Sequence, residues 1–202
     1  MDSEKNLVVE LRSIVEPLDL GDLFAGSQPL EVELGCGDAS FLVEWAQRHP
    51  ERNFIGVERL LGRISKLHRK GRRASLNNLR GVRIESSYFL QFLLPPACAA
   101  AIHVYFPDPW PKKRHHKYRL INEHFPALAR AALAPAGIIF LRTDDAPYFS
   151  QMTEIFDAQK EFKKIETPLD LAGLLTDFEK EFSARGIKTL RAAYQLVSPA
   201  SP

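Results

Sequence analysis

The sequence contains little cysteine, no long apolar segment and no spacing typical of metal ligands. Cys36 and Cys98 are its two cysteines among 202 residues, and we predict that both are free thiols in a reducing compartment. No window is apolar enough to cross a bilayer, and the N-terminus lacks the basic-then-apolar order of a signal peptide. These absences argue against a membrane partner, a bound metal and a disulfide-stabilised secreted domain. We therefore expect a cytoplasmic protein.

The net charge is also small, but the charges are segregated along the chain. A formal net charge of +2 gives by itself no reason to expect a polyanionic partner. Residues 59–84, however, include nine Lys or Arg and no acid, and a second basic cluster covers 112–119. A single charge run usually marks a solvated face, whereas two clusters in the same half of the chain favour a nucleic-acid partner.

The order of apolar and helical segments indicates the fold class. Hydrophobic residues make up 45% of the chain, enough for one full core, so we predict a single domain over 1–202. Apolar segments predict strands at 30–34, 53–57, 82–85, 99–106, 137–142, 162–165 and 189–197. Helical patterns cover 40–48, 60–73, 117–133 with an interruption or bend near Pro126, 145–158 and part of 175–185. We also predict an N-terminal helical segment over 1–28 and a flexible tail over 198–202. Alternating strands and helices predict an α/β fold with a parallel sheet covered on both faces.

A proline-rich stretch at 106–117 holds an acid and an indole between three prolines and ends in a basic run. Its sequence is Phe-Pro-Asp-Pro-Trp-Pro-Lys-Lys-Arg-His-His-Lys, with the acid at Asp108 and the indole at Trp110. Proline fixes φ and removes a backbone donor, so the preceding strand must end here and Asp108 is presented rigidly. Because ligands bind at the carboxyl ends of strands in open α/β sheets, we predict a catalytic or base-reading acid beside a nucleic-acid groove. A solvated proline loop is the alternative.

A Gly-Cys-Gly turn at 35–37 follows the first predicted strand. Two glycines let the backbone approach a ligand closely, because a side chain at either position would occupy that space. The dinucleotide fingerprint requires a further glycine where this chain has Ser40, and the acids Glu33 and Asp38 disfavour a pyrophosphate. Glu58, after the second predicted strand, is placed to accept both hydroxyls of a ribose. These features predict S-adenosylmethionine, a cationic nucleoside without phosphates; alternatively, Glu58 only caps the following helix.

Five motifs, in their order along the chain, resemble those of the bacterial tRNA (guanine-N7)-methyltransferases. They are Glu33-Leu34-Gly35-Cys36-Gly37, Gly56-Val57-Glu58, the proline-rich stretch 106–117, Thr143-Asp144 and Thr176-Asp177-Phe178-Glu179. The proline-rich stretch is specific to that family, while the glycine turn is generic to class I methyltransferases. The resemblance implies a Rossmann-like α/β fold with a mostly parallel seven-stranded sheet. It also implies methyl transfer from S-adenosylmethionine to N7 of guanine(46) in the tRNA variable loop.

The resemblance and the charge clusters together predict the site residues. Asp108 is the implied catalytic residue. The predicted cofactor-binding residues are Glu33, Gly35, Gly37, Glu58, Ser87 and Asp108. The implied substrate-binding residues are Lys112, Asp144, Thr176, Asp177, Phe178 and Glu179. The predicted tRNA phosphate contacts are Arg69, Lys70, Arg72, Arg73, Lys113, Arg114 and Lys117.

The end of the glycine turn and the residue near the adenine depart from the family pattern. Asp38 and Ala39 stand where many members have another glycine, so we expect a somewhat stiffer turn. The acid or asparagine that usually lies near the adenine is matched here by Ser87, with Ser86 beside it.

The implied reaction requires little from the protein. Guanine N7 carries a free lone pair and no proton, so it attacks a sulfonium methyl without a general base, and catalysis rests on proximity and orientation. Asp108 is placed to accept hydrogen bonds from the guanine N1–H and amine, or else to orient the cofactor. For Trp110 the sequence leaves both base stacking and core packing open.

Other classes of function remain at this stage. A methyltransferase of the same fold acting on a small molecule explains the glycine turn and Glu58 but leaves both basic clusters without a role. A non-catalytic RNA-binding domain explains the clusters but not the cofactor pocket, and a dinucleotide oxidoreductase conflicts with Ser40 and Glu33. The sequence leaves open whether the chain acts as a monomer or a homodimer.

Overall fold

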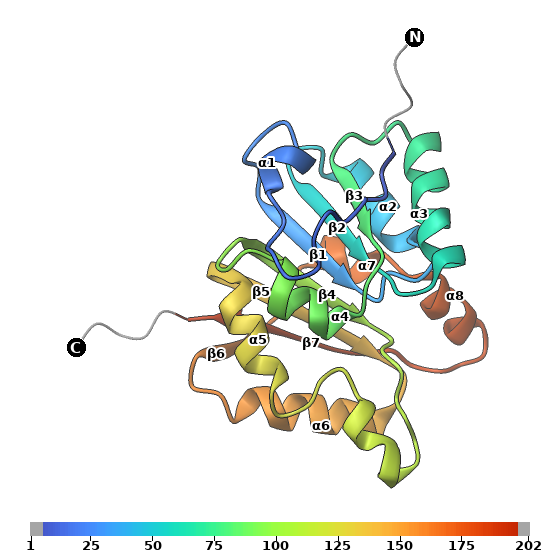
Figure 1. The fold of residues 1–202 in the computed structure, drawn as a ribbon. Helices are drawn as coiled ribbons and strands as arrows, with labels where there is room; N and C mark the ends of the chain where they lie inside the picture. Colours follow the sequence, from blue (N-terminus) through green and yellow to red (C-terminus); the bar gives the residue numbers. More distant parts are fainter. Residues whose placement is uncertain (1–5, 198–202) are drawn as a thin grey trace. The chain divides into compact units, whose positions relative to one another are not determined.

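Two compact units make up the chain in a computed structural model, which describes residues 6–197 (Figure 1). Unit 1 extends to Pro95 and unit 2 begins at Pro96. None of the helices between residues 6 and 197 is long and apolar enough to span a membrane.

Unit 1 contains three parallel strands in the order β3-β2-β1. Their bounds are Leu30–Leu34 for β1, Asn53–Val57 for β2 and Leu79–Val82 for β3. Every residue of the three strands is buried, as expected for parallel strands that are covered on both faces. The register pairs Leu34 with Val57, so the carboxyl ends of β1 and β2 lie at the same edge.

The helices of unit 1 follow its strands. They are α1 (Leu20–Leu23), α2 (Ser40–Arg48), α3 (Leu61–Arg73), α4 (Ser86–Tyr88) and the π-helix η1 (Phe89–Leu93). In α3 the apolar side chains recur at helical spacing, so Ile64 and Leu67 are buried while the basic residues lie on the other face.

Unit 2 contains four strands in the order β4-β5-β7-β6. Their bounds are Ala99–Tyr105 for β4, Leu133–Thr143 for β5, Phe162–Ile165 for β6 and Leu190–Leu196 for β7. Strands β4 and β5 are parallel, whereas β7 runs antiparallel to β5 and to β6. The seven strands of the two units confirm the predicted mostly parallel, Rossmann-like α/β fold.

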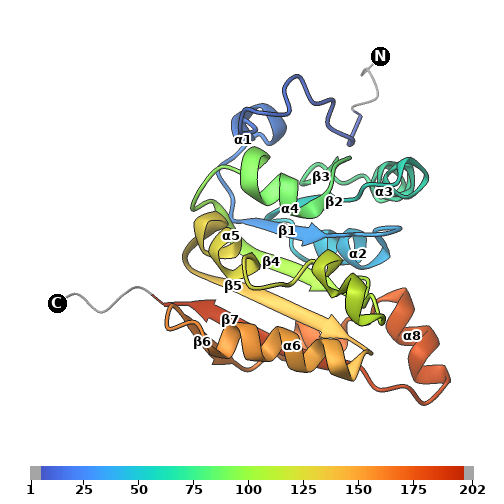
Figure 2. The same cartoon turned by 60° about the horizontal axis from the view of Figure 1, so that its bottom comes forward.

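Residues 96–197 of unit 2 form one 3-10 helix and four α-helices. They are η2 (Lys113–Tyr118), α5 (Phe125–Ala132), α6 (Ala146–Asp157), α7 (Leu169–Gly173) and α8 (Asp177–Ala184). Helix α6 packs along β5, β6 and β7, as Figure 2 shows. Its first residue follows Asp145, whose side chain accepts the N–H of Tyr148 and so caps the helix.

Three predicted elements were wrong in position or type. The strand expected at 82–85 lies at Leu79–Val82, because Glu85 instead caps α4 by accepting the N–H groups of Ser87 and Tyr88. The helix expected at 117–133 is replaced by η2 and the shorter α5. The predicted interruption near Pro126 is present, because α5 begins at Phe125 with Pro126 in its first turn. Within residues 6–28, which include most of the predicted N-terminal helical segment, α1 is the one helix. The predicted tail at 198–202 lies outside the described residues.

Candidate functional site

The glycine loop, residues 35–39, connects β1 to α2 in unit 1. Gly35 and Gly37 have φ values of +74° and +56°, in the left-handed region that glycine tolerates best. The N–H groups of Gly35 and Cys36 both donate to the carbonyl of Val57, at 2.8 and 2.9 Å. These bonds fix the loop to the end of β2, directly before Glu58. The structure therefore brings the predicted glycines and the predicted ribose acid to one edge of unit 1.

Three carboxylates, one of them within the glycine loop, act on Cys36. Burial raises the pKa of the Cys36 thiol well above its ordinary value, and the charges of Glu33, Glu58 and Asp38 raise it further. A ligand that carries positive charge is favoured by this environment, whereas a phosphate is not. A Cβ at Gly35 would meet no atom within 4 Å other than those of its chain neighbours, so the space beside this part of the loop is open. The sulfonium and the amine of S-adenosylmethionine fit both observations.

Glu58 is buried at the end of β2, with 6% of its surface exposed. Its Oε1 accepts the N–H of Leu60 at 2.8 Å, at the start of α3, and its Oε2 lies 3.7 Å from the guanidinium of Arg63. Leu60 is the N-cap residue of α3, and no side chain makes a capping hydrogen bond there, so the alternative that Glu58 only caps this helix is not borne out. Binding of a ribose by the same carboxylate stays a prediction.

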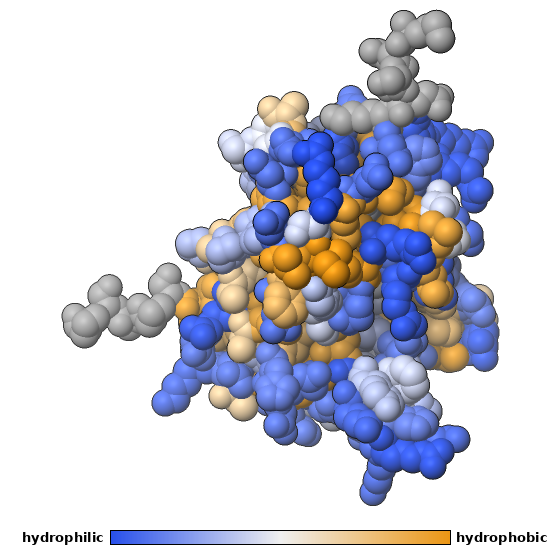
Figure 3. Space-filling view, viewed as in Figure 1, coloured by the Kyte–Doolittle hydropathy of each residue, from blue (hydrophilic) through white to orange (hydrophobic). Residues whose placement is uncertain are grey.

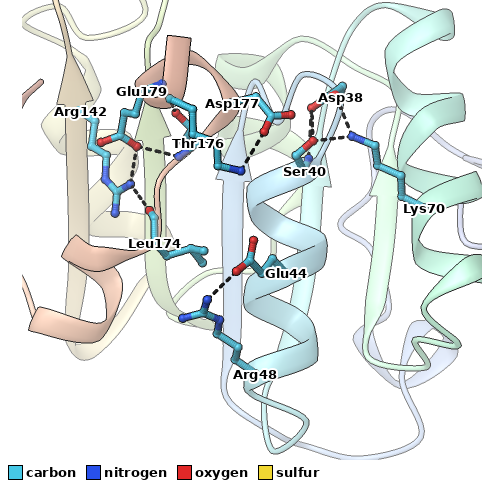
Figure 4. A network of polar contacts seen from close by, with 11 residues as sticks. Asp38, Ser40, Glu44, Arg48, Lys70, Arg142, Leu174, Thr176, Asp177 and Glu179 are labelled. Carbon is cyan, nitrogen blue, oxygen red and sulfur yellow. Dashed lines mark hydrogen bonds and ion pairs between the residues drawn. The ribbon is translucent and has the colours of Figure 1, made fainter. Parts of the chain in front are cut away.

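A polar network joins the glycine loop to α3 (Figure 4). The Asp38 carboxylate accepts the Nζ of Lys70 at 2.7 Å, and it also accepts the N–H and Oγ–H of Ser40 at 3.2 and 2.9 Å. The Lys70 amino group also donates to the Ser40 hydroxyl. Burial alone acts to raise the pKa of Asp38, but the bonds from Lys70 and Ser40 outweigh it and lower this pKa. Lys70, predicted from its charge to contact phosphate, is thus bonded to the glycine loop.

The remaining predicted contacts of unit 1 lie on α3 and α4. Arg69 and Arg73 are exposed and Arg72 is half-buried, all near the end of α3. Ser87 is half-buried on α4, where its N–H donates to the Glu85 carboxylate at 2.9 Å. Figure 3 shows hydrophobic residues gathered on the face that carries α4.

The proline loop, residues 106–112, leaves the carboxyl end of β4 in unit 2. The Phe106 N–H donates to the Arg142 carbonyl at 2.8 Å, and Phe106 then takes a φ of +49°. A positive φ is strained for a residue with a Cβ and turns the chain out of the strand direction. Asp108 follows two residues later and is exposed. Its predicted roles in catalysis and cofactor binding stay predictions.

Arg119 is bonded to the proline loop and was not among the predicted site residues. Its Nε donates to the Pro109 carbonyl at 2.7 Å, and its Nη1 donates to the Gln151 side chain on α6. The guanidinium also lies 4.6 Å from the ring centroid of Tyr148 and is buried, with 4% of the residue exposed. In the sequence Arg119 appeared to be one more cation of the basic cluster. Only its burial distinguishes it.

The basic run after the loop forms η2, which is drawn in yellow-green in Figure 1. Four of its cations are exposed to solvent, namely Lys112, Lys113, Arg114 and Lys117. Figure 3 shows the lobe in this position as almost entirely hydrophilic. Trp110 is 36% exposed and packs on this run, with ring centroids 5.3 Å from Tyr118 and 5.8 Å from His115. It is therefore not part of the core.

The C-terminal motif Thr176–Glu179 begins α8. Glu179 is fully buried, and its carboxylate accepts Arg142 Nη1 and the Thr176 N–H, both at 2.8 Å (Figure 4). It also accepts Arg191 Nη2 at 2.6 Å. The Thr176 hydroxyl in turn accepts the Glu179 N–H, which completes a capping box. Burial acts to raise the pKa of Glu179, but the Thr176 N–H and the two arginines outweigh it and lower this pKa. Asp177 and Phe178 are exposed beside it.

Arg142, at the end of β5, connects this motif to the strand edge. Besides the bond to Glu179, its guanidinium donates to the carbonyls of Leu171 and Leu174, at 2.5 and 2.8 Å. Asp144 follows two residues later and is exposed, at the same edge as the proline loop because β4 and β5 are parallel. Phe106 also lies 5.9 Å from Phe178, centroid to centroid. Unit 2 therefore brings Asp108, Asp144 and the C-terminal motif to one edge.

Comparison with known proteins agrees with this fold. Residues 27–192 match a family model described as a putative methyltransferase. The crystal structure of the 16S rRNA methyltransferase KamB superposes with a TM-score of 0.66 at 14% identity, over 91% of this chain and 95% of that one. A 16S rRNA methyltransferase from Catenulisporales acidiphilia, solved with its cosubstrate S-adenosylmethionine, gives a TM-score of 0.56 at 18% identity, over 92% and 94%. The fold is that of the class I methyltransferases.

Sequence relatives are more specific. The tRNA (guanine-N(7)-)-methyltransferase of Thiobacillus denitrificans is 37% identical over 185 residues, covering 90% of this chain and 80% of the relative. The same enzyme of Syntrophotalea carbinolica is 34% identical over 178 residues, covering 86% and 77%. The chain belongs to the tRNA (guanine-N7)-methyltransferase family, which confirms the resemblance seen in its motifs.

Proposed function

We propose that this chain transfers the methyl group of S-adenosylmethionine to N7 of a guanine in tRNA, and that this guanine is guanine(46) of the variable loop. The observation that carries the proposal is the exposed Asp108, held between prolines at the end of β4 and followed by the exposed cations of η2. An acid beside a basic surface suits a base to be oriented within a polyanion. The reaction would take place in the cytoplasm.

In unit 1 the glycine loop and its carboxylates would hold the cofactor. Gly35 and Gly37 leave room for the methionine part, Glu33 and Asp38 supply negative charge, and Glu58 is the acid for the ribose hydroxyls. When bound, S-adenosylmethionine supplies an electrophilic methyl group on a sulfonium.

In unit 2 the exposed polar residues would hold the guanosine and its phosphates. Asp108 accepts from the guanine N1–H and amine, which identifies the base and stabilises the positive charge that develops on the ring. No proton has to leave N7, so no general base is required. Lys112 and Arg114 face solvent and suit phosphate oxygens.

The test is incubation of the full chain with unmodified tRNA and labelled S-adenosylmethionine, followed by nucleoside analysis. We expect label in 7-methylguanosine and loss of that label when guanine(46) is replaced by adenine. Label in another nucleoside would contradict the proposed specificity, and no label in tRNA would favour a small-molecule substrate.

Asp108→Asn examines the role of the acid in the same assay. It keeps the size but presents an amide donor where guanine also donates, so single-turnover methylation should fall at least tenfold while tRNA affinity stays near that of the parent. A rate within threefold of the parent would make Asp108 a structural residue of the loop.

A further inference from the structure

An ion pair holds the part of the glycine loop that lacks a third glycine. Ala39 has a φ of +59° and is fully buried, although the left-handed region disfavours any residue with a Cβ. Its two neighbours, Asp38 and Ser40, are both bonded to the Nζ of Lys70. The strained residue is therefore bracketed by the two partners of one lysine.

The local restraint on Ala39 consists of the bonds from the N–H and Oγ–H of Ser40 to the Asp38 carboxylate, at 3.2 and 2.9 Å. The start of α2 has Ala39 as its N-cap residue, and no side chain makes a capping hydrogen bond there. Lys70 comes from α3, 32 residues away from Asp38 along the chain. The fully buried side chains of Ile64 and Leu67 anchor α3. The Lys70 amino group is therefore presented from a fixed helix.

The position of Lys70 differs from that of its basic neighbours. The Lys70 side chain is 32% exposed, while Lys66, one helical turn earlier, and Arg69 are exposed to solvent. An amino group that is engaged by a carboxylate at 2.7 Å is poorly placed to neutralise a phosphate at the same time. Among the cations of α3, Lys70 is thus bonded to the glycine loop and is poorly placed to bind a phosphate.

We propose that Lys70 is a positioning residue for the cofactor, which acts through Asp38 to hold the glycine loop in its binding conformation. This rests on the proposed function only for the identity of the ligand, S-adenosylmethionine. Lys70 touches neither the reacting methyl nor the tRNA in this scheme. Its effect is to keep the loop ordered before the ligand arrives, so that binding does not have to order it.

The experiment compares Lys70→Met with Lys66→Met, which removes the same charge from the same helix. Calorimetry without tRNA should show S-adenosylmethionine affinity about fivefold weaker for Lys70→Met, as expected for a partly exposed ion pair. Lys66→Met should bind as the parent does. Loss of the Lys70 charge alone would strengthen binding of the cationic S-adenosylmethionine. A weaker affinity would therefore show that the glycine loop has become less ordered. The KM for the cofactor should rise with kcat unchanged, and Lys70→Arg should restore most of the affinity.

A double-variant cycle with Asp38→Asn separates the pair from general destabilisation. In the Asp38→Asn background, Lys70→Met should weaken cofactor binding no further. The salt dependence of tRNA binding should be the same for Lys70→Met and the parent. Unchanged cofactor affinity, with a slope of log affinity against log salt smaller by about one, would make Lys70 a phosphate contact and overturn the proposal.

Hydrogen exchange measures the same restraint without any ligand. The Ala39 N–H donates to the Cys36 carbonyl at 2.8 Å, and its protection should fall in Lys70→Met but not in Lys66→Met. If the parent bound no S-adenosylmethionine, the proposed function would fail while this measurement still decided whether Lys70 orders the loop. Equal protection in the two variants would overturn the proposal.

Discussion

Replacing Glu179 by glutamine should destabilise the chain far more than its place in a predicted substrate motif indicates. The carboxylate is fully buried and compensates Arg142, of whose side chain 1% is exposed. Removing one partner of a buried ion pair costs about 3–5 kcal/mol. Arg142 keeps its carbonyl acceptors at Leu171 and Leu174, so we expect the lower end, about 3 kcal/mol. For a chain of this size, that lowers Tm by about 6–12 °C.

Thermal unfolding followed by circular dichroism measures this loss, with Glu181→Gln as the matched control. Glu181 lies on the same helix and forms an exposed pair with Arg185 at 3.7 Å, with side chains 65% and 62% exposed. Such a pair contributes little, so its loss should change stability by less than about 1 kcal/mol. If both variants unfolded at the same temperature, the argument from burial would be refuted.

The pH dependence provides a second measurement on Glu179. The folded chain lowers the pKa of this group, so its charge contributes stability that is complete above the unfolded pKa of about 4.3. That stability is lost as the pH falls through the folded pKa. The difference in Tm between parent and Glu179→Gln should therefore be full at neutral pH and should narrow below about pH 4. A difference that stays constant down to the lowest accessible pH would contradict the charge-based explanation.

Three further predictions concern binding and the proline loop. Glu58→Ala should weaken S-adenosylmethionine binding at least tenfold in calorimetry, because charged hydrogen bonds are worth about 1.5–3 kcal/mol each; an unchanged Kd would remove Glu58 from the site. The double change Lys112→Ala, Arg114→Ala should reduce the salt slope of tRNA binding by about two, and an unaltered slope would place the phosphates elsewhere. Arg119→Met should release the Pro109 carbonyl and lower single-turnover methylation more than it lowers cofactor affinity; equal losses in both would indicate general unfolding instead.

The strands and helices that follow a clear period were predictable from the sequence. Strands β1 and β2 and helix α2 lie where the apolar pattern placed them. Strand β3 was misplaced, because Arg80 and Gly81 interrupt its apolar pattern although both are buried. Arg80 is covered by Phe24, which lies 5.1 Å from its guanidinium. That packing is tertiary and leaves no local signal.

The site was predictable where a motif carries its own geometry. The glycine loop and the proline loop both leave strand ends as expected, and Asp108 is exposed. The motifs do not indicate which cations face solvent and which are bonded within the protein. Arg119 is buried under the proline loop and Lys70 is bonded to Asp38, although both stand in runs of solvent-exposed basic residues. Sequence gives the sign of a charge, while its partner comes from a segment that is distant along the chain.

The buried Arg119 under the proline loop has a consequence for selectivity among RNA molecules. The Pro109 carbonyl accepts a hydrogen bond from the buried Arg119 guanidinium, which also donates to Gln151 of α6. The loop is therefore ordered when the chain folds and loses little freedom on encounter. An ordered loop cannot adjust to a guanine that arrives at another angle, so the RNA has to deform instead. If tRNA is methylated as proposed, variable loops of different stiffness should be modified at different rates even when their sequences around the guanine are identical.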